Sequence, residues 1–314
     1  MLKKLNLSRR RLILAAAVSA LIVASPNIVR AALLGHEVRA QTFHQLEHGQ
    51  VTVTNFGNVN IHSYQSPEVI GCVTTHIIET PERLVFFDAQ RSVIFDQEIR
   101  EYSEALGKLV DRFIIHLHPD HWFGAHQFRE VPIYSLVEIM AEINQSGEFF
   151  IEISLPSLGH HVPPSKVVPT NVIQRGASKI IDCAEFERRY VCDAEADNFL
   201  TIYMPQQQSY IVQDLLYNNC HQFCGHCHFD SWINQLKGLR HETGFEHILP
   251  GHGSNDGSRQ SIDDAIIYLE LVKRIYETTS SGAALRAAIL ERYPSYRAAA
   301  VVDIQNLFLY PGSQ

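Results

Sequence analysis

The segment RFIIHLHPDH, residues 112–121, holds four potential metal ligands within its last six positions. Its apolar first half predicts a strand, so the polar half lies at the carboxyl end of that strand. Alternate side chains of an extended strand share a face, so His116 and His118 point the same way. The proline turn then presents Asp120 and His121 beside them. Imidazole and carboxylate are ligands that zinc prefers in catalytic sites, so this segment predicts a metal centre.

Strands and helices alternate along the rest of the chain. The expected strands, rich in β-branched and aromatic residues, are 51–53, 73–75, 84–87, 199–203 and 210–212. Helices are expected over 98–109 and 230–239, with a looser region around 156–169. No short repeat and no low-complexity linker interrupts this order. One α/β domain is therefore predicted for a chain of 314 residues.

The last part of the chain has a helical pattern. Ile262, Ile266, Leu269 and Lys273 follow one another at helical spacing, and a second helix is expected over 283–292. The segment 290–297 of this tail is expected either to pack over the domain or to form a dimer contact. The pattern does not predict an oligomeric state.

The first 31 residues differ in kind from the rest. Several lysines and arginines precede an uncharged apolar run from Leu12 to Ala24. A run of about thirteen residues fits a signal peptide better than a membrane span of roughly 20. The order Ser8-Arg9-Arg10 resembles a twin-arginine signal, and a general secretory signal is the alternative. The expected organisation is an export signal at 1–31, a catalytic domain at 40–260 and a helical C-terminal extension at 261–314.

Export predicts a periplasmic or secreted protein with no stable membrane span once the signal is removed. The segment 1–31 holds six of the 26 basic residues and no acidic residue, so 20 basic residues remain against 34 acidic ones. The mature protein therefore carries a net charge near −14. This sign argues against nucleic acid and anionic membrane surfaces as partners, because both attract basic patches. A small-molecule substrate is the expected partner.

The segment HLHPDH resembles the His-x-His-x-Asp-His signature of the metallo-β-lactamase superfamily. Other elements match in family order over about residues 50 to 255. Asp88 ends an early strand, where the family has an acidic residue that supports the ligands. Gln213-Asp214 is similar to the family's bridging Gly-Asp, and LPGHG at 249–253 is similar to its closing Pro-Gly-His-Gly. The resemblance implies an α/β fold, a four-layer αββα sandwich, here with a C-terminal helical tail.

The resemblance also implies a ligand set. His116 and His118 would hold the first metal, Asp120, His121 and His252 would hold the second, and Asp214 would bridge both. One position departs from the family pattern, because Ala194 stands where a further histidine of the first site is usual. Glu195, or a histidine of the loop 220–228, would have to replace it. The paired glycines after the signature are also changed, to Phe123-Gly124.

These departures leave three outcomes for the centre. In order of preference they are two metals with a substitute ligand, one metal in the second site only, and a degenerate site that binds metal poorly. A carboxylate is a competent replacement for imidazole on zinc and would add negative charge near the bridge.

A second cluster, CHQFCGHCH at 220–228, packs three cysteines and three histidines into nine residues. Its spacing is similar to the iron–sulfur motif of radical enzymes, but nothing around it resembles their barrel. An active-site flap that carries a disulfide, with His221 or His226 near the substrate, is expected. A loop with inert thiols is the alternative. The six cysteines of an exported chain permit disulfides, although the pairing cannot be predicted.

The resemblance implies a zinc-dependent hydrolase of a small-molecule ester, lactone or lactam. Water shared by two zinc ions would have its pKa lowered towards ~7 and would attack as hydroxide. Asp120 would be the catalytic residue that orients this nucleophile and passes its proton to the leaving group. Two alternatives stay open: an iron-dependent oxidoreductase of the same fold, and a binding protein with a single or impaired metal site.

Overall fold

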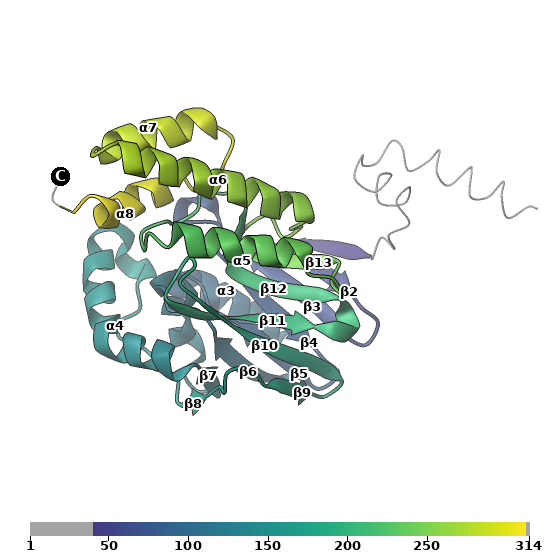
Figure 1. The fold of residues 1–314 in the computed structure, drawn as a ribbon. Helices are drawn as coiled ribbons and strands as arrows, with labels where there is room; N and C mark the ends of the chain where they lie inside the picture. Colours follow the sequence, from purple (N-terminus) through teal and green to yellow (C-terminus); the bar gives the residue numbers. More distant parts are fainter. Residues whose placement is uncertain (1–39, 312–314) are drawn as a thin grey trace, which may run out of the picture. The chain divides into compact units, whose positions relative to one another are not determined.

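The computed structural model describes residues 40–311 (Figure 1). The predicted export signal at 1–31 lies outside these residues. From Thr42 onward the chain forms one compact unit. Within the described part, no helix combines the length and the apolar composition that a bilayer span requires.

Two β-sheets form the centre of the molecule. Across the first sheet the strands are β1 (Gln41–Gln45), β2 (Gln50–Asn55), β3 (Asn60–Gln65), β4 (Thr74–Glu79), β5 (Arg83–Phe87), β6 (Leu109–Ile114), β7 (Ile133–Ser135) and β8 (Asn171–Val172). Across the second they are β13 (His247–Gly253), β12 (Ser209–Asn218), β11 (Asn198–Met204), β10 (Ala184–Cys192) and β9 (Ser178–Ile181). Pairing is antiparallel from β2 to β5 and parallel from β5 to β8, and β12 is parallel to β13.

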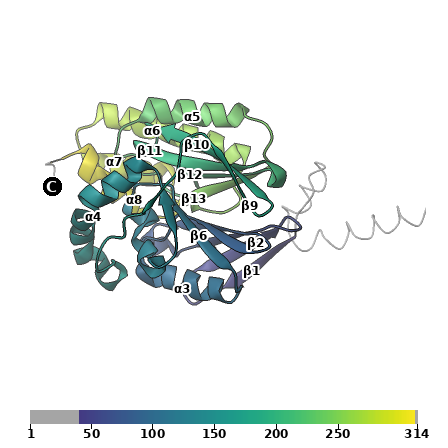
Figure 2. The same cartoon turned by 90° about the horizontal axis from the view of Figure 1, so that it is seen from below.

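Six helices pack around the two sheets in the described part of the chain. They are α3 (Val93–Glu104), α4 (Val137–Leu158), α5 (Phe229–His241), α6 (Arg259–Thr278), α7 (Gly282–Arg292) and α8 (Ala300–Leu309). Short 3-10 turns are η1 (Glu68–Ile70), η2 (Pro119–His121), η3 (Phe123–Phe128), η4 (Gly159–His161) and η5 (Pro205–Gln207). Figure 2 shows α3 beneath the first sheet and α5 with α6 above the second. This order is the predicted αββα sandwich.

The alternation of side chains along β5 shows how the sequence builds the layers. Leu84 and Phe86 pack towards α3, while Val85 and Phe87 enter the core between the sheets. Strand β12 is buried at all ten positions because it is covered on both faces. Such a strand is a rigid platform for side chains at its end.

The C-terminal helices pack on the domain. Residues of α6, α7 and α8 share one buried core with β12 and α5, including Leu269, Leu285 and Val302. Arg297 donates hydrogen bonds to Gln65 and Ser254 of the main body. The tail is therefore part of the outer layer over the second sheet.

Three sequence predictions need correction. The helix expected at 98–109 is α3 at Val93–Glu104, because Ser92 caps it by accepting the amide of Ile94. The region expected to be loose from 156 is still helical at its start, because Pro156 lies within the last turn of α4. Helix α8 lies within the extension expected to be helical at 261–314, but no separate helix was predicted at its position.

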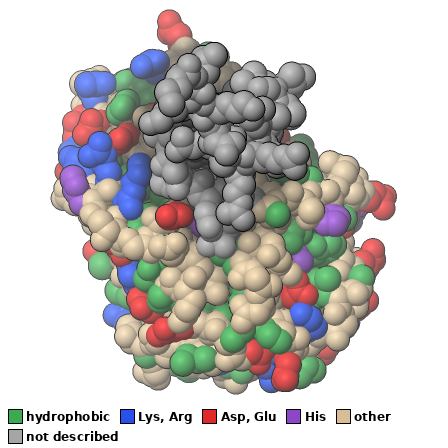
Figure 3. Space-filling model, turned by 90° about the vertical axis from the view of Figure 1, so that its right-hand side faces the viewer, with side chains coloured by type: hydrophobic (Ala, Val, Ile, Leu, Met, Phe, Trp, Pro, Cys, Tyr) green, Lys and Arg blue, Asp and Glu red, His purple; other side chains and the backbone are tan. Residues whose placement is uncertain are grey.

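Acidic and basic side chains are mixed on the face of the molecule drawn in Figure 3. Hydrophobic and uncharged polar groups separate them there. On the described part of this face that is visible, basic side chains are therefore interspersed with acidic ones.

Candidate metal centre

The three predicted ligands of the second site converge. Asp120 and His121 lie on η2 after β6, and His252 comes from β13. One ligand atom from each lies within 4.8 Å of the others. His252 Nε2 is 3.5 Å from Asp120 Oδ2. A strand-end turn and a neighbouring strand thus build a site that can hold a cation.

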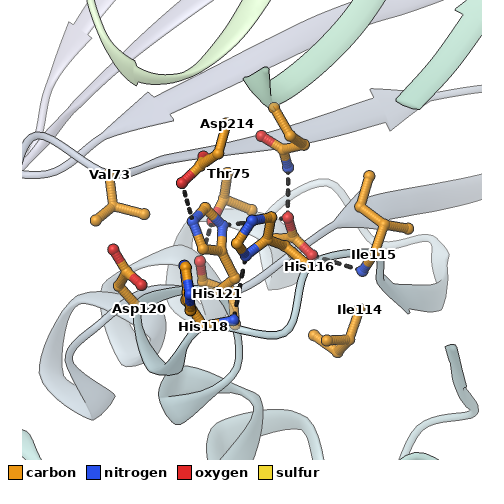
Figure 4. Close-up of polar contacts among 12 residues, drawn as sticks. Val73, Thr75, Ile114, Ile115, His116, His118, Asp120, His121 and Asp214 are labelled. Carbon is orange, nitrogen blue, oxygen red and sulfur yellow. Dashed lines mark hydrogen bonds and ion pairs between the residues drawn. The ribbon is translucent and has the colours of Figure 1, made fainter. Parts of the chain in front are cut away.

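Asp214 lies between the two parts of the centre, at the middle of β12. Its Oδ2 is 3.1 Å from His121 Nε2 and 3.2 Å from His252 Nε2. It also groups with His116 and His121 within the same 4.8 Å limit. Figure 4 shows Asp214 directed at the imidazoles of His116 and His121. Asp214 therefore lies between the two groups of candidate ligands, and its bridging role stays a prediction.

The predicted first site is completed by Glu195. Its Oε2 lies 2.8 Å from His116 Nε2, and its Oε1 lies 3.0 Å from His118 Nδ1. The side chain of Glu195 is fully buried. Ala194, in contrast, packs into the core under the second sheet. Of the two candidates for a substitute ligand, Glu195 therefore forms a group with His116 and His118.

Unpartnered buried atoms test whether a metal fits here. His252 donates its Nδ1–H to the carbonyl oxygen of Gly71 at 2.8 Å, so Nε2 carries the lone pair in the neutral ring. That Nε2 and Asp214 Oδ1 are both buried and have no hydrogen-bond partner among the described residues. A lone pair that faces carboxylate oxygens is stable only with a cation or a proton between them. The donor set thus suits a divalent metal of borderline softness such as zinc.

The pKa shifts of His252 and Glu195 also indicate that the centre stabilises positive charge. Burial alone would lower the pKa of His252, but Asp214 and Asp120 raise it to about 9. Burial would raise the pKa of Glu195, yet His118 and its neighbour His116 lower it to about 2. The carboxylates are therefore ionised and draw either protons or a metal into the centre.

Asp88 supports the ligands from behind, as the sequence predicted. Its Oδ1 accepts the amide of Ile115 at 2.7 Å, and its Oδ2 lies 3.2 Å from His121 Nδ1. Gln213 donates to the same Oδ2 at 2.7 Å. Gln213 has a φ of 46°, which explains why glycine is usual at this position. Its amide hydrogen bond offsets part of that backbone strain.

Two glycines leave room for acidic side chains. A Cβ at Gly251 would lie 1.9 Å from Asp214 Oδ1. A Cβ at Gly124 would lie 2.6 Å from the Cβ of Asp96, which forms a buried ion pair with Arg112. These close contacts fix the shape of the metal centre and of the turn beneath it.

Tyr217 is a residue of the centre that the sequence reasoning missed. Its hydroxyl donates to Asp214 Oδ2 at 2.8 Å and lies 3.4 Å from Glu195 Oε1. Its ring stacks on His252, with the ring centroids 4.4 Å apart. Burial, then Asp214 and Glu195, raise the pKa of Tyr217 well above its usual value, so the hydroxyl keeps its proton. Regular alternation along a strand would direct residues 214 and 217 to opposite faces. The register shift between Gln213 and Tyr217 explains why strand alternation gave no signal for this contact.

The loop 220–228 lies beside the centre, but it carries no disulfide. All six cysteines of the chain are free thiols, which corrects that expectation. His226 reaches the centre, with its Nε2 2.8 Å from His118 Nε2. His221 instead contacts the hydroxyl of Tyr268 in the core. Of the two alternatives, His226 therefore lies beside the centre and His221 lies in the core.

A cleft of about 420 Å³ opens above the centre. Its floor includes Asp120, Glu195, Tyr217 and His252. Apolar residues of α4, α8 and the loop 220–228 form much of its wall, and these are Phe150, Ile153, Phe223, Ile304, Leu307 and Phe308. Charged residues, among them Arg91, Glu138 and Glu142, also line the cleft.

No protein-family model matches the chain, and no curated protein matches it in sequence. Solved structures match its fold. A β-lactamase domain protein from Burkholderia ambifaria superposes with a TM-score of 0.57 at 12% identity, over 82% of this chain and 88% of that one. The metallo-β-lactamase IND-7 superposes with a TM-score of 0.53 at 14% identity, over 74% of this chain and 100% of that one. The chain has the metallo-β-lactamase fold.

A third solved structure with this fold belongs to an enzyme of a different kind. The stereoselective inverting sec-alkylsulfatase Pisa1 from Pseudomonas sp. superposes with a TM-score of 0.54 at 13% identity. The match covers 83% of this chain but half of that enzyme's length. The metallo-β-lactamase fold alone therefore does not specify the reaction, which depends on the side chains of the site.

Proposed function

We propose that this protein is an exported, zinc-dependent hydrolase that acts on a small-molecule ester, lactone or lactam outside the cytoplasm. One observation carries the proposal: two three-residue ligand sets converge at the floor of a cleft, with Asp214 between them. The metallo-β-lactamase fold supports it, and so does the sequence pattern of an export signal.

The residues present assign the ligands. His116, His118 and Glu195 would hold one zinc ion, Asp120, His121 and His252 would hold the other, and Asp214 would lie between them. Zinc at these positions supplies Lewis acidity, which lowers the pKa of water and polarises the substrate carbonyl.

Two side chains of the centre can handle protons. Asp120 is the more accessible carboxylate, with 24% of its side chain exposed at the cleft floor. It can accept the proton of the attacking water and pass it to the leaving group. Tyr217 retains its hydroxyl proton beside Asp214 and can donate to an oxygen that becomes negative during the reaction.

The walls of the cleft favour a substrate with an apolar group. Ile153 of α4 and Leu307 and Phe308 of α8 line the cleft and are each at least 50% exposed. Burying such side chains against a ligand is favourable by roughly 25 cal/mol per Å² of apolar surface. Among the described lining residues Arg91 is the permanent cation, opposed by Glu138 and Glu142, so a neutral carbonyl substrate is favoured over a sulfate ester.

Metal analysis and a hydrolysis screen test the proposal. The mature protein is expected to bind about two zinc ions and to cleave nitrophenyl esters, with dodecanoyl preferred over acetyl. Asp120→Ala should lose activity, whereas Asp230→Asn, on the exposed start of α5, should not. Lactones, a chromogenic β-lactam and a secondary alkyl sulfate complete the screen. Absence of bound metal would refute the proposal, and zinc binding without any hydrolysis would instead favour a binding protein.

An iron-dependent oxidoreductase is the second candidate, and one observation favours it. His116, His118 and Glu195 form a set of two histidines and one carboxylate, which non-haem iron oxygenases also use. Elemental analysis separates the candidates, because iron in the first site with oxygen consumption would support the oxidoreductase. Zinc in both sites would exclude it.

A further inference from the structure

The two ring nitrogens of His118 face different partners. Its Nδ1 lies 3.0 Å from Glu195 Oε1, on the side of the first metal site. Its Nε2 lies 2.8 Å from Nε2 of His226, a residue of the loop between β12 and α5. The Nδ1 of His226 in turn lies 3.5 Å from Asp197 Oδ1. These residues form a row from the surface carboxylate to the candidate ligand.

We propose that His226 and Asp197 position His118 as a metal ligand. This inference rests on the proposed function, because it requires a cation at His118 Nδ1. A neutral imidazole that gives the Nδ1 lone pair to a metal carries its proton on Nε2. His118 therefore donates to His226, whose Nε2 must accept and whose own proton must lie on Nδ1. That proton faces Asp197, so one arrangement of protons satisfies the whole row.

The geometry suits a hydrogen bond in the plane of the rings. The ring centroids of His118 and His226 are 5.0 Å apart and their planes differ by 26°. At this separation the rings do not stack face to face, and the two Nε2 atoms lie between them. The ring of Phe223 packs edge-on against both imidazoles, with its centroid 5.2 Å from that of His118 and 6.1 Å from that of His226. Rotation of either ring would therefore displace a packed neighbour.

The rest of the loop holds His226 in place. The amide of Cys224 donates to Gln305 Oε1 of α8 at 3.0 Å, and the amide of Cys227 donates to the Cys224 carbonyl at 3.1 Å. Cys224 and Gln305 are buried. The cysteine and histidine cluster thus has a role in metal binding although its thiols are not ligands in this arrangement. The loop supplies a second imidazole behind the first.

The test uses substrate-free mature protein, with zinc affinity measured against a chromophoric chelator. His226→Ala should lower the affinity for one of two zinc ions by about 10- to 100-fold and leave the affinity for the other unchanged. His226→Gln should retain most of the affinity, because its amide oxygen can accept from His118. Asp197→Asn should show a smaller loss. His228→Gln is the matched control, since His228 lies 3.6 Å from Asp197 in the same loop but is outside the described cleft lining.

Cobalt substitution gives a second readout, because its visible bands report the ligand field. The spectrum of His226→Ala should change, and that of His228→Gln should match the wild type. Unchanged zinc affinity and spectrum in a folded His226→Ala variant would overturn the inference. An equal loss in His226→Ala, His226→Gln and His228→Gln would also overturn it, because that result indicates loop folding. A wild-type protein that binds no metal would instead refute the proposed function itself.

Discussion

Replacement of Glu195 by glutamine is the sharpest perturbation of the candidate centre. The two side chains have the same shape, so Glu195→Gln removes one negative charge with little change in volume. The carboxylate is fully buried and lies 2.8 Å from His116 Nε2 and 3.0 Å from His118 Nδ1. The zinc content is expected to fall from about two ions per chain to about one.

The size of the effect follows from the role of the residue. Loss of a partner behind a ligand usually lowers metal affinity by about 10- to 100-fold. Loss of a ligand that is itself charged and buried should exceed that range, so a decrease of at least ~100-fold is expected, equivalent to about 2.7 kcal/mol. Chelator titration followed by elemental analysis measures both the affinity and the number of ions.

A second variant separates ligation from folding. Glu195→His supplies the imidazole that is usual in the first site and should keep two ions, whereas Glu195→Gln should keep one. Two ions of unchanged affinity in Glu195→Gln would refute the assignment of Glu195. Loss of both ions in a folded Glu195→Gln protein would also refute it, because Asp120, His121 and His252 form their group without Glu195.

Three further predictions concern stability and site shape. Arg112→Leu leaves Asp96 as an unpaired charge in a fully buried position, so the free energy of unfolding in urea should fall by about 3–5 kcal/mol. In Gly251→Ala the new Cβ would lie 1.9 Å from Asp214 Oδ1, so the Asp214 carboxylate must move and the zinc content should fall. The melting temperature should change less than that of Arg112→Leu. Unchanged zinc content would show that the loop can move instead. Burial opposes ionisation of Glu79, but neighbouring hydrogen bonds lower its pKa from 4.5 to about 2. Because the folded pKa is the lower one, Glu79 stabilises the fold fully above pH 4.5, and this contribution disappears as the pH falls towards 2. The urea midpoints of the wild type and Glu79→Gln should therefore converge over that window, and a constant difference would contradict the reasoning.

The sequence predicted those parts of the centre that depend on local geometry. A strand end followed by a proline turn predicted that His116, His118, Asp120 and His121 would lie close together, and each of them belongs to at least one of the three candidate metal groups. Asp214 and His252 were chosen only through the resemblance to the family, from the short motifs Gln213-Asp214 and LPGHG at 249–253. The sandwich followed from the same resemblance, and the superposed structures confirm it.

The first-site carboxylate could not be chosen from the sequence alone. Residues 193–197 form a tight loop between β10 and β11, in which Asp193 has a φ of 51°. The amide of Ala194 donates to the carbonyl of Ala196 at 3.2 Å, so the chain reverses around Glu195. A reversal of this kind directs one side chain into the centre and its neighbours into the core. Counting positions against a pattern cannot locate such a turn to within one residue.

Helix α4 escaped prediction because its apolar residues do not follow one helical face. Ile139 and Ile143 are buried, whereas Val137 and Leu155 lie on the opposite side of the helix and are at least 50% exposed. A helix that only covers a core has one apolar face, and its period is easy to detect. Apolar residues on both sides of α4 obscure this period, so the sequence alone did not reveal the helix.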